Sequence, residues 1–331
     1  MTRYRNTEDA FLGLLREVVE AGEEITVRGD KTRELLAQTI GIDQPRERCL
    51  FVTGRNNNVF ASIAESMWVI AGRNDIDYLS GYLKRARKYS DDGETWRGAY
   101  GPRLRNWNGT DQLAQVLAIL RADAASRRAV VMIFDPDRDF VKSPDIPCNN
   151  WLHFIARNGK LHLHVAARST DIWWGFSGIN IFEWTLLLEV MACWLGLEIG
   201  RLTFFTSSLH LYERHFEKAT VVLDSLADRS PLYAAGIESP RFTTPWNDFG
   251  RTMNRWMRLE TELRNGADLE ELSIGFNDPL LEQYIRMIDI FWNFKRHSPR
   301  DVLDRKIAVL GGSDLGCAAA EFVGRANNDK H

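Results

Sequence analysis

The pattern of apolar and polar positions predicts helices that alternate with strands over residues 1–245. Apolar side chains recur at helical spacing in Thr7–Ala21, Asn58–Ala71 and Asp111–Asp123, so that each run carries them on one face. A fourth run, which ends at about Trp194 before Gly196, is apolar nearly all round. A helix of that kind is normally enclosed by other elements. We therefore expect three amphipathic helices and one core helix.

Two strand-like runs, Trp151–Arg157 and Lys160–Arg168, are separated by Asn158-Gly159. Asn-Gly between two such runs is a strong signal for a hairpin with a type I′ turn. Shorter strands are expected at Ala129–Phe134 and Arg201–Thr206. The chain therefore combines helices and strands within one region, which is typical of an α/β protein.

Polar stretches that contain glycine are expected to form loops. The basic stretch Val27–Glu34 is a candidate phosphate-binding loop, and a solvated turn is an equally good interpretation. Tyr78–Arg105 carries several turn signals, and loops of that length inside a compact domain are often functional. Leu209–Tyr212 is expected to open a further helix that includes His215.

Helical patterns dominate beyond about Thr243, as in Asn254–Arg264 and Pro279–Phe294. We therefore expect a catalytic domain, residues 1–245, and a helical C-terminal extension packed on it, residues 246–331. Lys306–Gly312 looks briefly like a strand followed by a dinucleotide phosphate loop, but it does not complete GxGxxG. Too little chain follows it for a βαβ unit, so that interpretation is a weak alternative.

Composition narrows the class of protein. The 331 residues are 44% hydrophobic and 26% charged, which is ordinary for a chain that buries a sizeable core. The net charge of −3 gives no electrostatic reason to expect nucleic acid or a membrane surface as a partner. No apolar run predicts a transmembrane helix. The four cysteines include no CxxC pair, which disfavours a metal site or dithiol chemistry and favours a reducing, cytoplasmic location.

The stretch that says most about chemistry is Asp145–Trp151, in which Cys148 follows a proline in a short polar loop. The predicted hairpin would fix the direction of this cysteine, and Arg168, Ser169 and Asp171 follow the end of its second strand. A thiol nucleophile beside an anion site is our starting hypothesis. A buried structural cysteine is the more frequent situation when the residue is considered alone.

Other side chains could complete such a site. Glu65 lies beside the apolar face of its predicted helix; a carboxylate there is usually a boundary residue, but if buried it would have a raised pKa and could transfer protons. Arg127 and Arg128 would ordinarily be solvated, but as a pair they could clamp a phosphate. Trp173 and Trp174 could line a pocket for a planar ligand, and core packing is at least as frequent a role.

Taken in order along the chain, these motifs resemble those of the thymidylate synthase family. The most specific are Pro147-Cys148, Arg168-Ser169-Thr170-Asp171, Asn180-Ile181 and His210-Leu211-Tyr212, and the upstream matches are Glu65, Tyr100-Gly101 and Ser126-Arg127-Arg128. The resemblance covers roughly residues 25–225. It implies an α/β protein with a mixed sheet, a homodimer, a pyrimidine nucleoside monophosphate as substrate and 5,10-methylenetetrahydrofolate as one-carbon donor.

The resemblance also implies roles for individual residues. Cys148 matches the nucleophile that attacks the pyrimidine ring, Glu65 the general acid and base, and Tyr100 a member of the proton network. The implied phosphate ligands are Arg168, Ser169 and Arg28 (with Arg33 as the alternative to Arg28), and Arg127 and Arg128 from the partner subunit. The implied base and sugar ligands are Asn149, Asn180, His210 and Tyr212, and the implied folate ligands are Asp171 and Trp68.

The sequence departs from the family's pattern at positions that bear on the base and on the last step. Asn149 stands where thymidylate synthases carry a histidine, and Gly175 and Asn180 are one residue further apart than usual. A tryptophan pair that precedes Tyr100 in thymidylate synthases is missing here. The short C-terminal segment that closes over folate has no clear counterpart.

Without the tryptophan pair and the closing segment, the reaction intermediate is less shielded from water. Attack by water should then be favoured over hydride transfer, and the product is a hydroxymethyl group in place of a methyl group. Nucleotide hydroxymethylases of bacteriophages and of nucleoside-antibiotic pathways, which act on cytidylates or on dUMP, resemble the chain in this respect. We predict 5-hydroxymethylation of CMP or dCMP, although Asn180 stands where the cytosine-reading phage enzymes carry an aspartate. The alternatives are a divergent thymidylate synthase that methylates dUMP and a nucleotide-binding homologue without catalysis.

Overall fold

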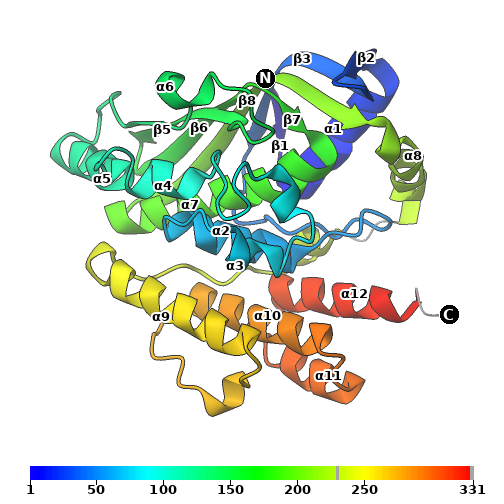
Figure 1. The fold of residues 1–331 in the computed structure, drawn as a ribbon, viewed down its shortest axis with the longest axis vertical. Helices are drawn as coiled ribbons and strands as arrows, with labels where there is room; N and C mark the ends of the chain where they lie inside the picture. The colour runs from blue at the N-terminus through cyan, green and yellow to red at the C-terminus, as the bar shows by residue number, and fades with distance from the viewer. Residues whose placement is uncertain (229–230, 329–331) are drawn as a thin grey trace.

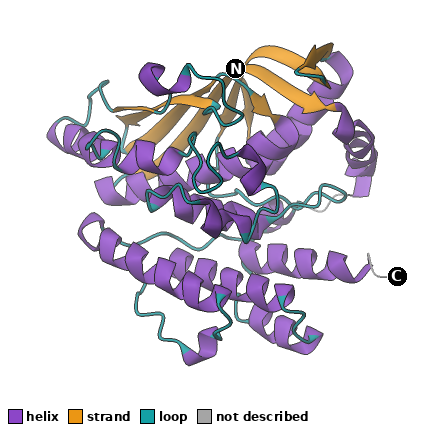
Figure 2. Ribbon diagram, in the orientation of Figure 1, coloured by secondary structure: helices purple, strands orange, loops and turns teal. Residues whose placement is uncertain are grey.

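One mixed β-sheet carries the strands of the computed structural model, which describes residues 1–228 and 231–328 (Figures 1 and 2). Its strand order is β1-β3-β8-β6-β5-β4, with β2 paired to β3 and β7 paired to β8. The β3–β8 and β5–β6 pairs are antiparallel and the β6–β8 pair is parallel, so the predicted α/β fold with a mixed sheet is confirmed. The strands are β1 (Thr2–Tyr4), β2 (Glu23–Val27), β3 (Asp30–Ile42), β4 (Val130–Met132), β5 (Asn149–Arg157), β6 (Lys160–Ala167), β7 (Thr170–Asp171) and β8 (Glu198–Tyr212).

The main helices cover one face of the sheet in successive layers (Figure 1). α1 (Thr7–Ala21) packs on β3, and α7 (Ile181–Leu195) packs on β6 and β8. α2 (Val59–Ile70) lies on the far side of α7. The other helices of this part are α3 (Ile76–Ser80), α4 (Tyr100–Arg105), α5 (Gln112–Ala122), α6 (Pro136–Asp139) and α8 (Phe216–Asp224), with 3-10 turns at Ala86–Tyr89, Glu213–His215, Ser225–Asp228 and Leu232–Ala235. The helices predicted at α1, α2 and α5 are confirmed.

The main helices leave the opposite face of the sheet largely open. Along β5, Leu152 and Phe154 are buried beneath the helices, whereas Trp151 and His153 on the other face are only half-buried. Phe205 of β8 lies on that face too and is 37% exposed. Buried and half-buried side chains alternate along the strand, as expected for a sheet that is covered on one face. The open face nevertheless carries more apolar side chains than an ordinary solvated surface.

The hairpin predicted at Asn158-Gly159 is confirmed. Both residues have positive φ angles, 51° and 73°, as a type I′ turn requires. The turn joins β5 to β6, with Arg157 paired to Lys160. The hairpin therefore carries the segment around Cys148 at the end remote from the turn, beside the beginning of β7.

Two expectations about strands were wrong. Val27–Glu34 is no loop, because β2 and β3 pair and turn at Arg28-Gly29, where φ is 54° and 88°. Every residue of β2 is exposed, so its sequence carries no alternating pattern and its strand form depends on pairing with β3. Leu209–Tyr212 continues β8 and does not open a helix, because β3 supplies its partner residues.

A π-helical segment, Ile172–Asn180, leads into the long helix α7. Each turn of a π-helix holds one residue more than an α-helical turn, and this accommodates the additional residue between Gly175 and Asn180. Gly196 ends α7 in the left-handed conformation, with φ at 66°. Ile172–Leu195 is long and apolar enough to cross a membrane, but 89% of an 18-residue apolar stretch within it is buried inside the fold. The predicted core helix is confirmed.

The chain after Thr244 is helical and forms the layer below α2 and α3 in Figure 1. Its helices are α9 (Trp246–Arg264), α10 (Pro279–Lys295), α11 (Arg300–Ala308) and α12 (Asp314–Asn328), with a 3-10 turn at Leu269–Glu271. The strand considered for Lys306–Gly312 was wrong, because α11 includes its first residues. The cytoplasmic location stays a prediction.

Buried polar contacts fasten this helical layer to the rest of the chain. Asp278, which caps α10, accepts hydrogen bonds from the backbone N–H groups of Thr243 and Thr244. Arg48 pairs with Glu189 of α7 and donates to Tyr284 of α10 at 3.3 Å. The hydrophobic core is also continuous across the junction. The division at residue 245 therefore stays a prediction about domains, although the change to an all-helical structure is observed there.

Candidate active site

Cys148 lies just before β5 and is half-buried. The side chain of Arg168, which follows β6, reaches back across the strand ends towards it. Its guanidinium donates to the backbone carbonyls of Pro147 and Ile146, both at 3.0 Å, and Nη2 lies 3.6 Å from Sγ of Cys148. The attacking form of cysteine is the thiolate, and this guanidinium offers it a cationic partner.

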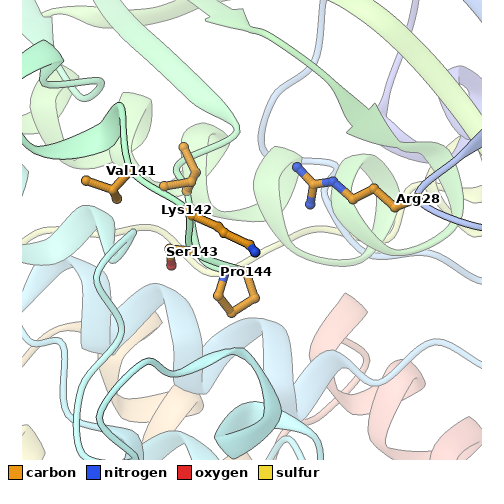
Figure 3. A pocket seen from close by; sticks show the side chains of 6 residues that line it. Arg28, Val141, Lys142, Ser143 and Pro144 are labelled. Atoms are coloured by element: carbon orange, nitrogen blue, oxygen red, sulfur yellow. The ribbon is translucent and has the colours of Figure 1, made fainter.

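A cleft of about 500 Å³ opens beside this loop, and cationic side chains line it. Figure 3 shows Arg28, from the β2–β3 turn, and Lys142 pointing towards one another across it. Arg33 is directed elsewhere, because it donates to the carbonyl of Val19 and packs over the ring of Phe216. The structure thus places Arg28, and not Arg33, where a phosphate could bind.

Lys142 was not identified from the sequence. It is exposed, and it lies on the cleft only because the loop before Cys148 returns towards the β2–β3 turn. Ser169 is close to the same loop and accepts a hydrogen bond from Nη1 of Arg168 at 3.2 Å. Arg28 and Lys142 line the cleft, and Arg168 contacts the same loop at Ile146 and Pro147 with Ser169 beside it. We call these four residues the cationic rim, and their charged and hydroxyl groups suit a phosphate.

Arg127 and Arg128 do not reach this cleft within one chain. Both are exposed and precede β4, where Val130 pairs with His153. Cys148 lies beyond the other end of that pairing, past the Met132–Trp151 pair. The structure therefore does not bring Arg127 and Arg128 to the cleft of their own chain, and the contact with a partner's phosphate that the resemblance implies stays a prediction.

The predicted proton network is buried behind Cys148. Glu65 of α2 is 8% exposed, and burial raises its pKa to about 8, with a smaller contribution from Asp145. Tyr100 begins α4; burial raises its pKa well above the usual range, and the neighbouring charges of Cys148 and Glu183 add to the shift. A carboxyl with a pKa near neutrality can both accept and donate protons.

Asn149 contacts Tyr100 and Trp184. Its side chain is fully buried, Nδ2 donates to the hydroxyl oxygen of Tyr100 at 2.6 Å, and Oδ1 accepts from the indole of Trp184 at 3.3 Å. These hydrogen bonds hold Tyr100 in place. Direct binding of the base by Asn149 stays a prediction.

Asn180 lies at the junction of the π-helical segment and α7, where it is 8% exposed. Its Nδ2 donates to Oε2 of Glu183 at 3.3 Å, one turn further along. Glu183 is 1% exposed, and its pKa is raised well above the ordinary value by burial and then by Glu65. Glu183 was not identified from the sequence, although a glutamate in an almost wholly apolar helix, three residues after Asn180, is an unusual feature that indicates a role.

His210 and Tyr212 are neighbours on one face of β8, with ring centroids 5.1 Å apart. Pairing of β7 with β8 sets Asp171 opposite His210. The hydroxyl of Ser208 lies 3.4 Å from Nδ1 of His210 and donates to Glu34. The predicted sugar ligands and the predicted folate carboxylate are therefore brought together by strand pairing.

The predicted folate ligands fall into two groups. Asp171 is half-buried and accepts from the N–H of Trp173, and restricted access to water raises its pKa to about 6. Trp174 beside it is 46% exposed. A half-buried carboxylate next to an exposed aromatic plane fits the N–H groups and the flat ring of a pterin.

Trp68 is enclosed in the core. It is 1% exposed, and its indole N–H donates to the carbonyl of Asp75 at 3.0 Å. It packs edge-on against Trp96, which is half-buried. The ring therefore supports Trp96, and its predicted contact with folate stays a prediction. Among the described residues, no group of His, Cys, Asp and Glu side chains could hold a metal ion.

A cysteine beside an arginine, a cleft with cationic side chains, and a buried carboxyl with a raised pKa are typical of an enzyme that uses a thiol nucleophile on an anionic substrate. The chain belongs to the thymidylate synthase family, whose family model matches residues 9–244. It is accordingly a one-carbon transferase that acts on a pyrimidine nucleotide with 5,10-methylenetetrahydrofolate as donor.

Similar proteins from three bacteriophages are each named deoxyuridylate hydroxymethyltransferase. The protein of Bacillus phage SP01 is 39% identical over 276 residues, which cover 76% of this chain and 72% of the phage protein. The protein of Pseudomonas phage M6 is 32% identical over 296 residues, or 85% and 81% of the two chains. That of Delftia phage PhiW-14 is 37% identical over 196 residues, or 56% and 54%. These relatives form a hydroxymethylase branch of the family.

Proposed function

We propose that this enzyme converts dUMP to 5-hydroxymethyl-dUMP. The observation that carries the choice of base is the hydrogen bond from Nδ2 of Asn180 to Glu183. It leaves Oδ1 of Asn180 to accept a hydrogen bond from the base. Uracil offers the N–H of its third ring atom, whereas cytosine has no hydrogen there, and an unmatched buried acceptor is costly. The names of the similar phage proteins support the same choice, so dUMP replaces the predicted CMP or dCMP.

Cys148 begins the reaction by adding to carbon 6 of the ring, which places electron density on carbon 5. Arg168 keeps the sulfur next to a cation and, with Ser169 and Arg28, holds the phosphate. Binding energy from the phosphate is remote from the reacting carbon and serves to position the ring against the sulfur. His210 and Tyr212 offer polar groups to the sugar.

We include a homodimer in this proposal. Arg127 and Arg128 are exposed but remote from the Cys148 of their own chain, so they would bind phosphate at the site of the partner subunit. The open face of the sheet, with Trp151 and Phe205 on it, offers an apolar surface for such a pairing. A two-fold contact through this face would exchange the arginine pairs reciprocally.

Methylenetetrahydrofolate, when bound, supplies the one-carbon unit that carbon 5 attacks. Asp171 and Trp174 would hold its ring over the nucleotide. Glu65, with Tyr100 kept in place by Asn149, takes the proton that carbon 5 loses. Departure of tetrahydrofolate, together with loss of that proton, would leave an exocyclic methylene group at carbon 5 of the base, which is still joined to Cys148 through carbon 6.

The fate of that methylene separates this reaction from thymidylate synthesis. The tryptophan pair that precedes Tyr100 in thymidylate synthases is missing, and Trp68 is enclosed in the core, so less aromatic surface shields the methylene from water. Two buried carboxyls with unpartnered oxygens, Glu65 and Glu183, supply polar surroundings for a water molecule. Both features favour water over hydride as the group that attacks.

Product analysis with four nucleotides tests this proposal. The enzyme is incubated with methylenetetrahydrofolate and dUMP, UMP, dCMP or CMP, and the nucleotide and folate products are identified by mass. We expect turnover with dUMP, a hydroxymethyl product and tetrahydrofolate. A preference for CMP or dCMP would contradict the role given to Asn180. A methyl product with dihydrofolate would establish a thymidylate synthase instead.

A further inference from the structure

Two carboxyl groups lie buried next to Tyr100, and no cationic side chain of the described residues pairs with either. Glu65 is 8% exposed and Glu183 is 1% exposed. Among the described residues, Oε2 of Glu65 and Oε1 of Glu183 have no hydrogen-bond partner. Each carboxyl is a cause of the raised pKa of the Tyr100 hydroxyl, so all three groups are neighbours. Unpartnered buried oxygens of this kind are rare and call for a functional or solvent partner.

Glu189, on the same helix, shows how a purely structural buried carboxylate is accommodated here. It pairs with Arg48 and accepts from the backbone N–H of Phe242 at 3.1 Å. Glu183 has no arginine or lysine partner in the described residues; its one hydrogen bond comes from the neutral amide of Asn180. The protein therefore buries Glu183 close to a second carboxyl at an energetic cost that packing does not explain.

We propose that Glu183 is a catalytic residue that binds, together with Glu65, the water molecule that attacks the exocyclic methylene and removes its proton. The two unpartnered oxygens give a water molecule two acceptors, which is what ordered buried waters require. This role rests on the proposed hydroxymethylation, because only that reaction needs an activated water. The hydrogen bond to Asn180 ties Glu183 to the residue that faces the base.

The proposed step balances in atoms and electrons. The water oxygen forms a bond to the methylene carbon, and one water proton moves to the carboxylate of Glu183. The π electrons of the methylene double bond shift towards oxygen 4 of the ring as an enolate. Collapse of the enolate restores the double bond between carbons 5 and 6 and breaks the bond from carbon 6 to Sγ of Cys148, which leaves as thiolate. No oxidant or reductant takes part, and Glu183 later returns its proton to solvent.

A second carboxyl is useful because the reaction releases two protons at different stages. The proton of carbon 5 leaves before the methylene exists, and the water proton leaves after it. Glu65 alone would have to discharge the first proton before it could accept the second. With Glu183 present, the water can be deprotonated while Glu65 still carries a proton, which shortens the life of a reactive methylene.

The variant Glu183→Gln tests this role. Glutamine has the same shape and its side-chain oxygen can still accept from Asn180, but it cannot take a proton. Two readouts are compared with dUMP: release of tritium from carbon 5, which reports the steps up to the methylene, and formation of the hydroxymethyl product. We expect tritium release to stay within about threefold of the wild-type rate and product formation to fall by roughly 100-fold or more.

A thiol added to the reaction tests whether the methylene still forms in the variant. A thiolate can attack the methylene without a protein base, so the variant should yield the corresponding thioether at carbon 5. Glu189→Gln is the matched control on the same helix. It should lower the unfolding temperature because it disrupts the Arg48 pair, yet leave the ratio of product to released tritium at the wild-type value.

The outcomes separate this inference from the proposed function. If the wild-type enzyme gives methyl product and dihydrofolate, the hydroxymethylase assignment fails and the role of Glu183 fails with it. If the wild type gives hydroxymethyl product but Glu183→Gln keeps the wild-type ratio of product to tritium, the inference alone is overturned. Equal loss of both readouts in a folded variant would also overturn it, since that pattern belongs to a residue needed for binding.

Discussion

The guanidinium of Arg168 lies 3.6 Å from Sγ of Cys148 while also donating to the backbone carbonyls of Ile146 and Pro147. The side chain of Arg168 thus lies next to the nucleophile, holds the loop before it and belongs to the cationic rim. A lysine could keep the charge but not the planar fork that makes these contacts together.

We expect Arg168→Lys to lower kcat/KM for dUMP by on the order of 100-fold, because the loop and sulfur lose their fixed geometry. The effect should appear in tritium release as well as in product formation, since it precedes the methylene. Alkylation of Cys148 by iodoacetamide gives an independent measure and should slow in the variant. Unchanged tritium release would show that Arg168 does not contribute to the steps before the methylene forms.

Replacing Asn180 by aspartate should alter the choice of base. The carboxylate of an aspartate can accept a hydrogen bond from the amino group of cytosine. Uracil has an oxygen at that position, so two hydrogen-bond acceptors would face each other and repel. We expect Asn180→Asp to reduce kcat/KM for dUMP by roughly 100-fold or more and to raise turnover of dCMP relative to dUMP. The measurement is kcat/KM for both nucleotides under the same conditions. A variant that loses both nucleotides equally would show that Asn180 does not discriminate between the bases.

Glu65 makes stability depend on pH in a defined direction. Its pKa of about 8 in the folded chain is above the ordinary 4.5, so the folded state holds this proton more tightly than the unfolded state. The free energy of unfolding therefore falls as pH rises from about 4.5 to 8, because the unfolded chain ionises first. The loss amounts to about 1.4 kcal/mol for each unit of pKa difference.

Glu65→Gln removes that loss because the amide never ionises. We expect the unfolding free energy of the variant, relative to wild type, to rise between pH 5 and pH 9, while tritium release from dUMP is largely lost. Denaturant unfolding at several pH values supplies the comparison. A difference that stays flat across this range would mean that Glu65 is solvated in the folded enzyme.

The shared arginines predict complementation between two inactive variants. Cys148→Ala lacks the nucleophile, and the double variant Arg127→Ala with Arg128→Ala lacks the pair that would bind phosphate in the partner subunit. In a mixed dimer, one site combines an intact Cys148 with intact arginines from the other chain. Random mixing should restore about a quarter of wild-type activity. No recovery after subunits are shown to exchange would argue against arginines shared between chains.

Local signals were enough to predict much of the fold. The Asn158-Gly159 turn, the amphipathic helices α1, α2 and α5 and the apolar α7 each depend on residues close in sequence, and all were confirmed. β2 and the last part of β8 were missed because they gain their hydrogen bonds from β3, which lies far from β8 in the chain. Such pairing leaves little trace in a polar strand.

The candidate site shows the same limit. Cys148, Arg168 and Asp171 follow from their places around the hairpin, and strand pairing does bring them to one region. The enclosed positions of Asn149 and Trp68 depend on Trp184, Tyr100 and Asp75, which come from other elements. Lys142 could not be identified from the sequence, because a lysine in a loop gains a role only from its neighbours in space. Glu183 could have been identified, because a glutamate in an almost wholly apolar helix is unusual.

The central claim is that water, and not hydride, completes the reaction on dUMP. The direct test is a reaction with dUMP and methylenetetrahydrofolate in water labelled with heavy oxygen, followed by mass analysis of the nucleotide. We predict a 5-hydroxymethyl product whose new oxygen carries the label, together with tetrahydrofolate. An unlabelled methyl product formed together with dihydrofolate would contradict the account.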